Sequence, residues 1–216
     1  MSGRPLITWA IEIALKSELF SEVVVSTDDR EIAEIARAAG ASVPFERPAD
    51  LSSDYASTAA VVAHAVSAMQ ARGFSGSLAC CIYPASIFIS AADLTASRRL
   101  LESSNRDFAV ALVRYQHPIQ RALYVDADQT VTALDPVSID QRTQDLQPRW
   151  HDAGQFYWGR VAACLAQTPV LPNSMAYEIN ANDVQDIDEE VDWRRAQVIH
   201  ALLLEKAGSD PESTDW

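Results

Sequence analysis

The chain has 216 residues and a formal net charge of -13, with 48% hydrophobic and 22% charged residues. This length fits one α/β domain with a real core, and the composition is ordinary for a soluble globular protein. The acidic balance argues against a nucleic-acid-binding surface and against docking on an anionic membrane, since both need basic patches. No apolar run approaches the ~20 residues of a transmembrane helix, so we expect neither nucleic acid nor a membrane as a partner.

The three cysteines, Cys80, Cys81 and Cys164, indicate a reducing compartment. Their number is odd, and two of them are adjacent in an apolar run, where neighbours on a strand point to opposite faces. The N-terminus lacks the layout of a signal peptide. We therefore expect a cytoplasmic protein with free, packed thiols.

Helices and strands alternate through the first half of the chain. Hydrophobic periodicity predicts helices over residues 5–16, 29–39, 57–71 and 91–102, and strands over residues 22–26, 41–45, 78–83 and 107–114. For the second helix, Asp28 is the expected N-cap, Glu31 completes a capping box, and Gly40 ends the helix. This alternation predicts an α/β fold with a doubly wound, mostly parallel sheet.

The pattern changes after residue 114. Residues 121–126 and 130–134 alternate in polarity around a polar turn, which predicts a β-hairpin. A strand over 155–159, a short helix through Cys164 and a long helix over 189–205 follow. We expect one domain over residues 1–206, with an excursion over about residues 117–145 that leaves the sheet, and a flexible tail over 207–216.

The segment 184–188, Val-Gln-Asp-Ile-Asp, contains two carboxylates near its end. Asp186 and Asp188 are two residues apart, so they lie on one side of an extended segment and can hold Mg²⁺. The alternative is that Asp188 caps the helix that follows. Upstream, residues 151–159 form an aromatic, glycine-broken block that suits a sugar-binding wall. Together the two segments indicate nucleotidyl transfer to a sugar.

A polar group also follows the strand over 22–26. Ser26, Thr27 and Asp28 lie where a doubly wound sheet binds its ligands, at the carboxyl end of a strand. The alternative is that they only cap the next helix, and the two roles can coexist.

Several segments resemble the acylneuraminate cytidylyltransferases, and within that family the chain is most similar to the pseudaminic acid branch. They span nearly the whole chain: residues 3–7, 25–29, 47–58, 117–123, 142–146, 151–159 and 184–188. The resemblance implies a Rossmann-like fold of the nucleotide-diphospho-sugar transferase type with a hairpin excursion. It also implies Mg²⁺ as cofactor, and CTP and an acidic nine-carbon sugar as substrates. The excursion would reach over the partner's site in a homodimer.

The resemblance assigns roles to individual residues. Asp186 and Asp188 would hold Mg²⁺, and Arg142 would pair with the sugar carboxylate through two parallel hydrogen bonds, so these three are the expected catalytic residues. The expected nucleotide-binding residues are Ser26, Thr27, Asp28, Arg47 and Thr58. The expected sugar-binding residues are Tyr83, Arg121, Arg142, Gln144, Gln155, Phe156 and Tyr157. The alternatives are solvent-facing loop arginines for Arg47 and Arg142, a helix cap for Thr58, and a core strand for residues 155–157.

The family begins with a strand and a basic, glycine-rich phosphate loop ahead of the segment that matches residues 3–7, and these are absent here. We therefore expect two strands with unpaired edges, and impaired transfer of CMP from CTP to pseudaminic acid with release of pyrophosphate. Two alternatives stay open. One is a sister enzyme for sialic, legionaminic or 3-deoxy-manno-octulosonic acid, and the other is a non-catalytic remnant that keeps the fold.

Overall fold

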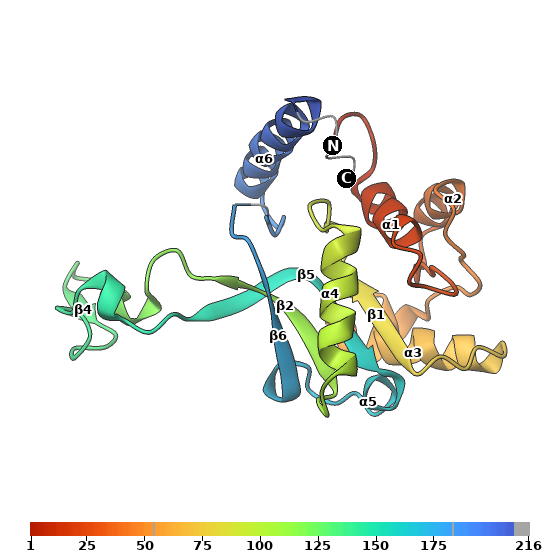
Figure 1. Ribbon diagram of the computed structural model, residues 1–216, viewed down its shortest axis with the longest axis horizontal. Coiled ribbons are helices and arrows are strands. Elements are labelled where there is room, and N and C mark those ends of the chain that lie inside the picture. Colours follow the sequence, from red (N-terminus) through yellow and green to blue (C-terminus); the bar gives the residue numbers. More distant parts are fainter. Residues whose placement is uncertain (54, 183, 210–216) are drawn as a thin grey trace.

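A four-stranded sheet with helices on both faces and a long projection at one end make up the computed structural model, which describes residues 1–53, 55–182 and 184–209 (Figure 1). The helices are α1 (Leu6–Lys16), α2 (Arg30–Ala38), α3 (Thr58–Ala71), α4 (Ala91–Glu102), α5 (Val161–Leu165) and α6 (Glu190–Ser209). The strands are β1 (Leu78–Ile82), β2 (Phe108–Arg114), β3 (Leu123–Val125), β4 (Val131–Ala133), β5 (Trp150–Arg160) and β6 (Ser174–Ile179). Short 3-10 turns cover Ala49–Leu51, Ile119–Arg121, Thr143–Asp145 and Leu171–Asn173.

The sheet has the strand order β1-β5-β2-β6. β1 and β2 pair antiparallel with β5, and β6 pairs parallel with β2, so three strands run in one direction and β5 runs against them. This arrangement confirms the expected α/β class, with one reversed strand inside the sheet. The sequence patterns missed β6 entirely, and β5 is longer than the strand expected over residues 155–159.

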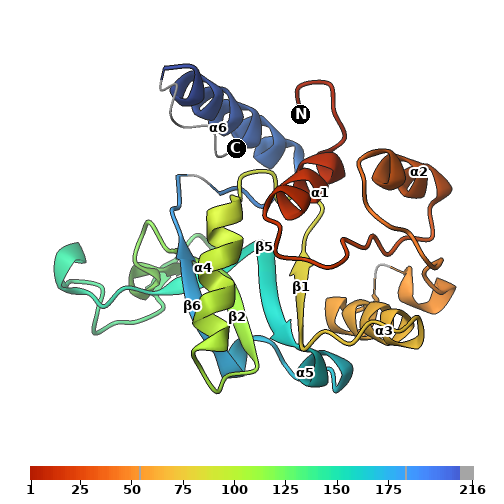
Figure 2. The same cartoon turned by 45° about the vertical axis from the view of Figure 1, so that its right-hand side comes forward.

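β5 lies between β1 and β2, and helices pack on both faces of the sheet, so the side chains of β5 are buried on either side. Phe156 and Trp158 pack toward α4, where Trp158 Nε1 donates a hydrogen bond to Leu94 O at 3.1 Å. The helices α3 and α5 cover the opposite face of the sheet (Figure 2). Tyr157 points to that face and packs there against Phe108. Burial of these large apolar side chains is the main stabilisation of the sheet.

Two predicted strands do not form regular strands. Residues 22–26 and 41–45 are joined by a single parallel bridge, Val24 to Ser42. Within the described residues, β1 pairs with β5 alone, so its other edge has no strand partner. A run of valines predicts a buried strand from local pattern, but a strand needs a neighbour to complete its hydrogen bonds.

The expected N-cap of α2 is also wrong by one residue. Asp29, not Asp28, accepts the Ile32 N–H at 3.0 Å, so the capping box between Asp28 and Glu31 is not formed. Thr27 lies two residues before this cap, and its hydroxyl oxygen accepts the Asp29 N–H at 3.1 Å. The helix therefore starts at Arg30, one residue later than expected.

The predicted hairpin is confirmed. β3 and β4 form an antiparallel ribbon within residues 115–149, a segment we call the arm, which projects away from the sheet (Figure 1). α6 continues to Ser209, so residues 207–209 of the expected tail are helical, and residues 210–216 lie outside the described residues. In the described part of the chain, no helix is both long and apolar enough to cross a bilayer.

One hydrogen bond ties the edge strand β6 to α4. Tyr177 Oη donates to Asp93 Oδ1 at 2.7 Å, while Asp93 Oδ2 accepts from the N–H and hydroxyl of Ser90 in the capping box of α4. We expect Tyr177→Phe to lower the free energy of unfolding by about 1–2 kcal/mol, because a hydrogen bond to a carboxylate is lost. Urea denaturation measures this. Tyr55→Phe, at a tyrosine that is 97% exposed and lies outside the arm, is the matched control, and an equal loss in both variants would contradict the assignment.

Candidate active site

The central strand β5 carries a large bulge where it passes β2. Val110 of β2 is paired with Tyr157 of β5, and Leu112 is paired with Asp152. Between these two pairs, β2 has one residue and β5 has four. Gly154 lies inside this bulge with φ +62°, a left-handed conformation that favours glycine. Asp152 Oδ1 accepts the Gly154 N–H at 2.9 Å, which stabilises the turn of the chain.

The bulge holds the acidic segment 184–188 directly against its backbone. A Cβ placed on Gly154 would lie 2.5 Å from Asp186 Oδ2 and 2.6 Å from Asp186 Cγ, so only glycine leaves room for the carboxylate. Gln155 Nε2 donates to Ala153 O at 3.2 Å and to Gln185 O at 3.4 Å. The bulge and the amide of Gln155 therefore fix the position of Asp186.

Negative charges gather around Asp186. Partial burial raises the pKa of the Asp186 carboxyl, and the charge of Asp188 and then those of Asp152 and Asp192 raise it further. Asp192, in the first turn of α6, accepts the N–H groups of Asp188 and Glu189 at 3.4 and 3.1 Å. Asp192 thus performs the capping that was the alternative role for Asp188, whose carboxylate accepts no hydrogen bond within the described residues.

This donor set fits a hard divalent cation. Carboxylate oxygens are the ligands that Mg²⁺ prefers, and a cation would relieve the repulsion that raises the pKa of Asp186. Among the residues that the structure describes, no three His, Cys, Asp or Glu side chains are placed so that together they could hold a metal ion. A cation at Asp186 and Asp188 would therefore keep positions for water or substrate oxygens, as Mg²⁺ usually does.

Tyr83 and Thr58 border the same acidic group. Burial raises the pKa of Tyr83 to about 12, and the charges of Asp152 and Asp186 act in the same direction, while a hydrogen bond with the Thr58 hydroxyl opposes them. Ser57, not Thr58, is the N-cap of α3, so the Thr58 side chain is not occupied by capping. Both residues thus lie where the sequence predicted substrate contacts, beside the carboxylates.

The other expected nucleotide-binding residues form a second polar group. Arg47 N–H donates to Thr27 O at 3.0 Å, and the Arg47 guanidinium lies 4.0 Å from Asp28 Oδ1. Ser26 Oγ and Arg47 Nε are buried and have no partner in the structure. Phe45 packs edge-on against His64, which ties this segment to α3. The group has unused polar atoms that a ligand can satisfy.

The arm carries a third group, apart from the first two. Arg121 Nη1 donates to Thr143 Oγ1 at 3.2 Å. Arg142 Nε donates to Gln144 Oε1 at 2.7 Å with the amide in the orientation that satisfies both residues, and lies 3.9 Å from Asp145. Arg121, Arg142 and Gln144 therefore make their described contacts with residues of the arm itself, and none of these contacts is with Asp186.

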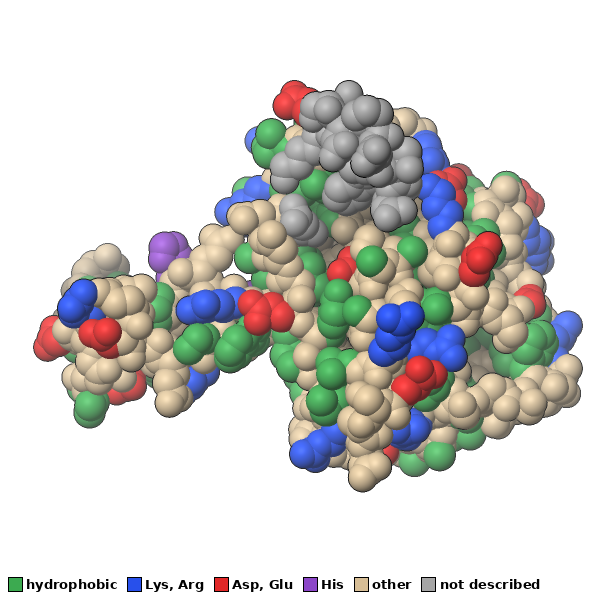
Figure 3. Space-filling view, in the orientation of Figure 1, with side chains coloured by type: hydrophobic (Ala, Val, Ile, Leu, Met, Phe, Trp, Pro, Cys, Tyr) green, Lys and Arg blue, Asp and Glu red, His purple; other side chains and the backbone are tan. Residues whose placement is uncertain are grey.

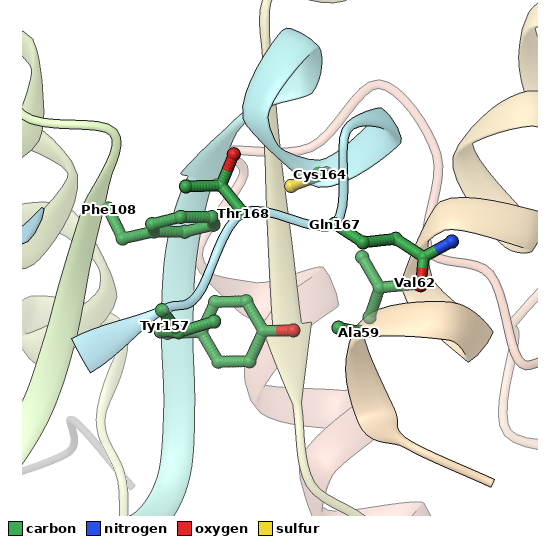
Figure 4. A pocket seen from close by; sticks show the side chains of 8 residues that line it. Ala59, Val62, Phe108, Tyr157, Cys164, Gln167 and Thr168 are labelled. Carbon is green, nitrogen blue, oxygen red and sulfur yellow. The ribbon is translucent and has the colours of Figure 1, made fainter. Parts of the chain in front are cut away.

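Three residues expected to line the sugar are core residues instead. The exposed fractions are 0% for Gln155, 1% for Phe156 and 5% for Tyr157. The Tyr157 ring points between Phe108 and Ala59 into a cavity of about 10 Å³, far too small for a sugar (Figure 4). These three residues are buried because β5 is an inner strand of the sheet and helices cover the sheet on both faces. Gln155 acts by positioning Gln185 and Asp186, not by touching a ligand.

The sequence reasoning did not assign roles to Asp152 and Gly154, although both lie in the aromatic block. An aspartate two residues before a glycine is a signal for a side-chain-capped turn, and a bulge follows from such a turn within a strand. The contact between Gly154 and Asp186 joins segments about 30 residues apart and leaves no local signal.

We expect Gly154→Ala to weaken binding of a divalent cation at Asp186 at least tenfold, because the new methyl group occupies the place of the carboxylate. The left-handed backbone adds a cost of about 1–2 kcal/mol to the free energy of unfolding. Titration with Mn²⁺, followed by water proton relaxation, and thermal unfolding measure the two effects.

Gly73→Ala is the matched control, because Gly73 also has a positive φ, +95°, but nothing within 4 Å of an added Cβ. It is expected to lose stability alone. Unchanged Mn²⁺ binding by a folded Gly154→Ala protein would contradict the role of Gly154.

Comparison with known proteins gives the same picture. A family model described as Cytidylyltransferase matches residues 1–188. The pseudaminic acid cytidylyltransferase of Campylobacter jejuni strain NCTC 11168 is 36% identical over 95% of this chain and 89% of its own length. A Helicobacter pylori protein that is both a pseudaminic acid cytidylyltransferase and a UDP-2,4-diacetamido-2,4,6-trideoxy-beta-L-altropyranose hydrolase is 31% identical over 93% of this chain and 38% of its own. The solved structure of a CMP:2-keto-3-deoxy-manno-octonic acid synthetase with CTP has a TM-score of 0.65 at 16% identity, covering 93% of this chain and 89% of that chain.

Proposed function

Because the chain belongs to the cytidylyltransferase family, we propose that it transfers CMP from CTP to pseudaminic acid and releases pyrophosphate. The sugar follows from the similarity to the Campylobacter jejuni enzyme over nearly the full length of both chains. The observation that carries the reaction type is the Asp186 carboxylate, held in place against Gly154 with Asp188, Asp152 and Asp192 close by.

We propose Mg²⁺ as the cofactor, held by the carboxylates of Asp186 and Asp188. When bound, Mg²⁺ neutralises phosphate charge and lowers the pKa of a hydroxyl group near it. The protein's own contribution is positioning. The bulge of β5 and the Gln155 amide hold Asp186 in place before substrate arrives, which removes an ordering cost from the reaction step.

On the nucleotide side, the group of Ser26, Thr27, Asp28 and Arg47 is proposed to bind the cytidine part of CTP. Its buried, unpartnered Ser26 Oγ and Arg47 Nε are available for hydrogen bonds with a polar ligand. Thr58 is the first residue of α3 and hydrogen-bonds Tyr83, which lies within reach of the charges of Asp152 and Asp186, so both residues are proposed to contact the substrate beside Asp186.

Release of pyrophosphate with CTP, Mg²⁺ and pseudaminic acid tests this function. We expect release by the wild-type chain, and at least a hundredfold loss in Asp186→Asn and Asp188→Asn, because each removes a proposed ligand of the cation. Glu34→Gln, which removes an exposed carboxylate on α2, is the control and should keep the wild-type rate. Release with sialic acid in place of pseudaminic acid would reassign the sugar, and release with no acidic sugar would contradict the proposal.

We further propose that the protein is a homodimer joined through the arm. The ribbon of the arm exposes Leu123, Tyr124, Val125 and Val131, an apolar density that single chains rarely leave in water. Arg121, Arg142 and Gln144 lie on the same arm, so a partner's arm would supply them to the acidic site of the other chain.

We also propose a reducing, cytoplasmic location for the protein, since Cys80, Cys81 and Cys164 are free thiols.

We expect Leu123→Lys combined with Val125→Lys to convert the dimer to a monomer at micromolar concentration, because two charges would be buried at the interface. Sedimentation velocity measures the change. Val198→Lys with Leu202→Lys places the same charges on exposed apolar positions of α6 and should leave the dimer intact. A wild-type chain that sediments as a monomer would contradict the proposal.

A further inference from the structure

The carboxylate of Asp192 uses both of its oxygens to hold the segment that carries the proposed cation ligands. Asp192 Oδ2 accepts the N–H groups of Asp188 at 3.4 Å and of Glu189 at 3.1 Å. Asp192 Oδ1 accepts from the side-chain amide of Gln185 at 3.2 Å and lies 3.6 Å from the guanidinium of Arg195. Asp192 is the third residue of α6, a position from which an acidic side chain reaches back to the N–H just before the helix. One side chain thus contacts both ends of the acidic segment.

Gln185 extends these contacts to the backbone of Asp186. Its amide nitrogen donates to the Asp186 carbonyl oxygen at 2.6 Å as well as to Asp192. The backbone is therefore held at the carbonyl of Asp186 and at the N–H of Asp188, the two residues proposed to bind the cation. Ligands of a metal ion keep their geometry only when neighbouring groups hold them in this way.

α6 is itself a firm support for Asp192. Ala196, one turn further along the helix, is 0% exposed and belongs to an apolar cluster that includes Met1. Ile187, which lies between the two proposed ligands, packs against the same cluster. Figure 1 shows α6 beside the N-terminal segment of the chain, beyond the end of β6. The helix and the acidic segment are thus anchored in one apolar cluster.

The bulge of β5 accounts for the position of Asp186 but leaves that of Asp188 to be explained. Its close contact is between Gly154 and the Asp186 carboxylate, and its hydrogen bond to the segment reaches the Gln185 carbonyl oxygen. Asp188 has a described hydrogen bond through its own N–H, to Asp192. Asp192 therefore gives Asp188 the support that Gly154 gives Asp186.

We propose that Asp192 is a positioning residue for the cation site, which sets the direction of the Asp188 carboxylate without binding the cation. Both oxygens of Asp192 are engaged by N–H donors. In the part of the chain that the structure describes, no three acidic, His or Cys side chains are placed to hold a metal ion together, so Asp192 does not complete a set of three ligands. Fixing the backbone in advance reduces the conformational entropy that Asp188 loses when the cation binds. This inference rests on the proposed function.

Titration with Mn²⁺, followed by water proton relaxation without substrate, tests the inference. Folded Asp192→Ala should bind Mn²⁺ about tenfold more weakly or worse, because the N–H groups of Asp188 and Glu189 lose their acceptor. Asp192→Asn should stay within about threefold of the wild type, because one amide oxygen can still accept both N–H groups. An Asn variant that binds as weakly as the Ala variant would show that Asp192 acts by its charge or as a ligand, and would overturn the inference.

Glu190→Ala is the matched control. Glu190 also lies in the first turn of α6, its side chain is 71% exposed, and it forms an ion pair with Arg194. The substitution removes the same charge from the same turn but none of the contacts to the acidic segment. Figure 3 shows acidic and basic side chains mixed over the visible surface, so loss of one exposed carboxylate changes the surface charge little. Mn²⁺ affinity should stay within about twofold of the wild type.

Turnover separates this inference from the proposed function. Weaker Mn²⁺ binding in Asp192→Ala, with no turnover by the wild type, supports the inference and contradicts the transfer reaction. Wild-type Mn²⁺ affinity in folded Asp192→Ala, with turnover by the wild type, overturns the inference and leaves the function standing. If Asp192→Ala does not fold, Asp192→Glu replaces it, since it keeps the charge but displaces the oxygens, and unchanged affinity there overturns the inference. A wild type that binds no Mn²⁺ overturns the inference and the proposed cation site together.

Discussion

The close approach of the Asp186 carboxylate to the backbone of Gly154 is the constraint on which the site depends. It requires a residue without a Cβ, a left-handed backbone at that residue, and a bulge wide enough to expose it. The bulge in turn requires that β5 be held firmly on both sides, which β1 and β2 do. The position of the Asp186 carboxylate at the surface therefore depends on how β5 packs in the centre of the sheet.

Electrostatics explains why such a rigid support is needed. Partial burial raises the pKa of the Asp186 carboxyl, and repulsion from three other carboxylates, those of Asp188, Asp152 and Asp192, raises it further. Left free, a segment of this charge would separate, since like charges at short range disfavour one another. The bulge, the Gln155 amide and the capping by Asp192 hold the segment against that repulsion. A cation at the proposed site would relieve this repulsion, so carboxylates held close together would bind it more tightly than scattered ones.

The sequence predicted the fold class, the hairpin, the helices and the pair Asp186 and Asp188, because each leaves a local signal in periodicity or spacing. It missed β6, whose six residues show no clear alternation, and which exists because β2 offers a parallel edge. It predicted a regular strand over residues 22–26, but this apolar segment forms only a single bridge, from Val24 to Ser42. The sugar-lining role of Gln155 failed for a related reason, since burial of β5 depends on strand order, which sequence spacing does not encode.

The placement of the arginines shows how an acidic protein handles two anionic substrates. Arg47 lies with the group proposed for the nucleotide, Arg114 on the sheet beyond the carboxylates, and Arg121 and Arg142 on the arm. Within the described residues, none of these four arginines forms an ion pair with Asp186 or Asp188, and Arg195 pairs with Asp192 at 3.6 Å. A basic residue moved next to Asp186 would bind substrate phosphate but would also compete with the cation. An arginine kept apart from Asp186 leaves its carboxylate available, so in the proposed reaction a cation and a guanidinium can each neutralise part of the charge of the substrate.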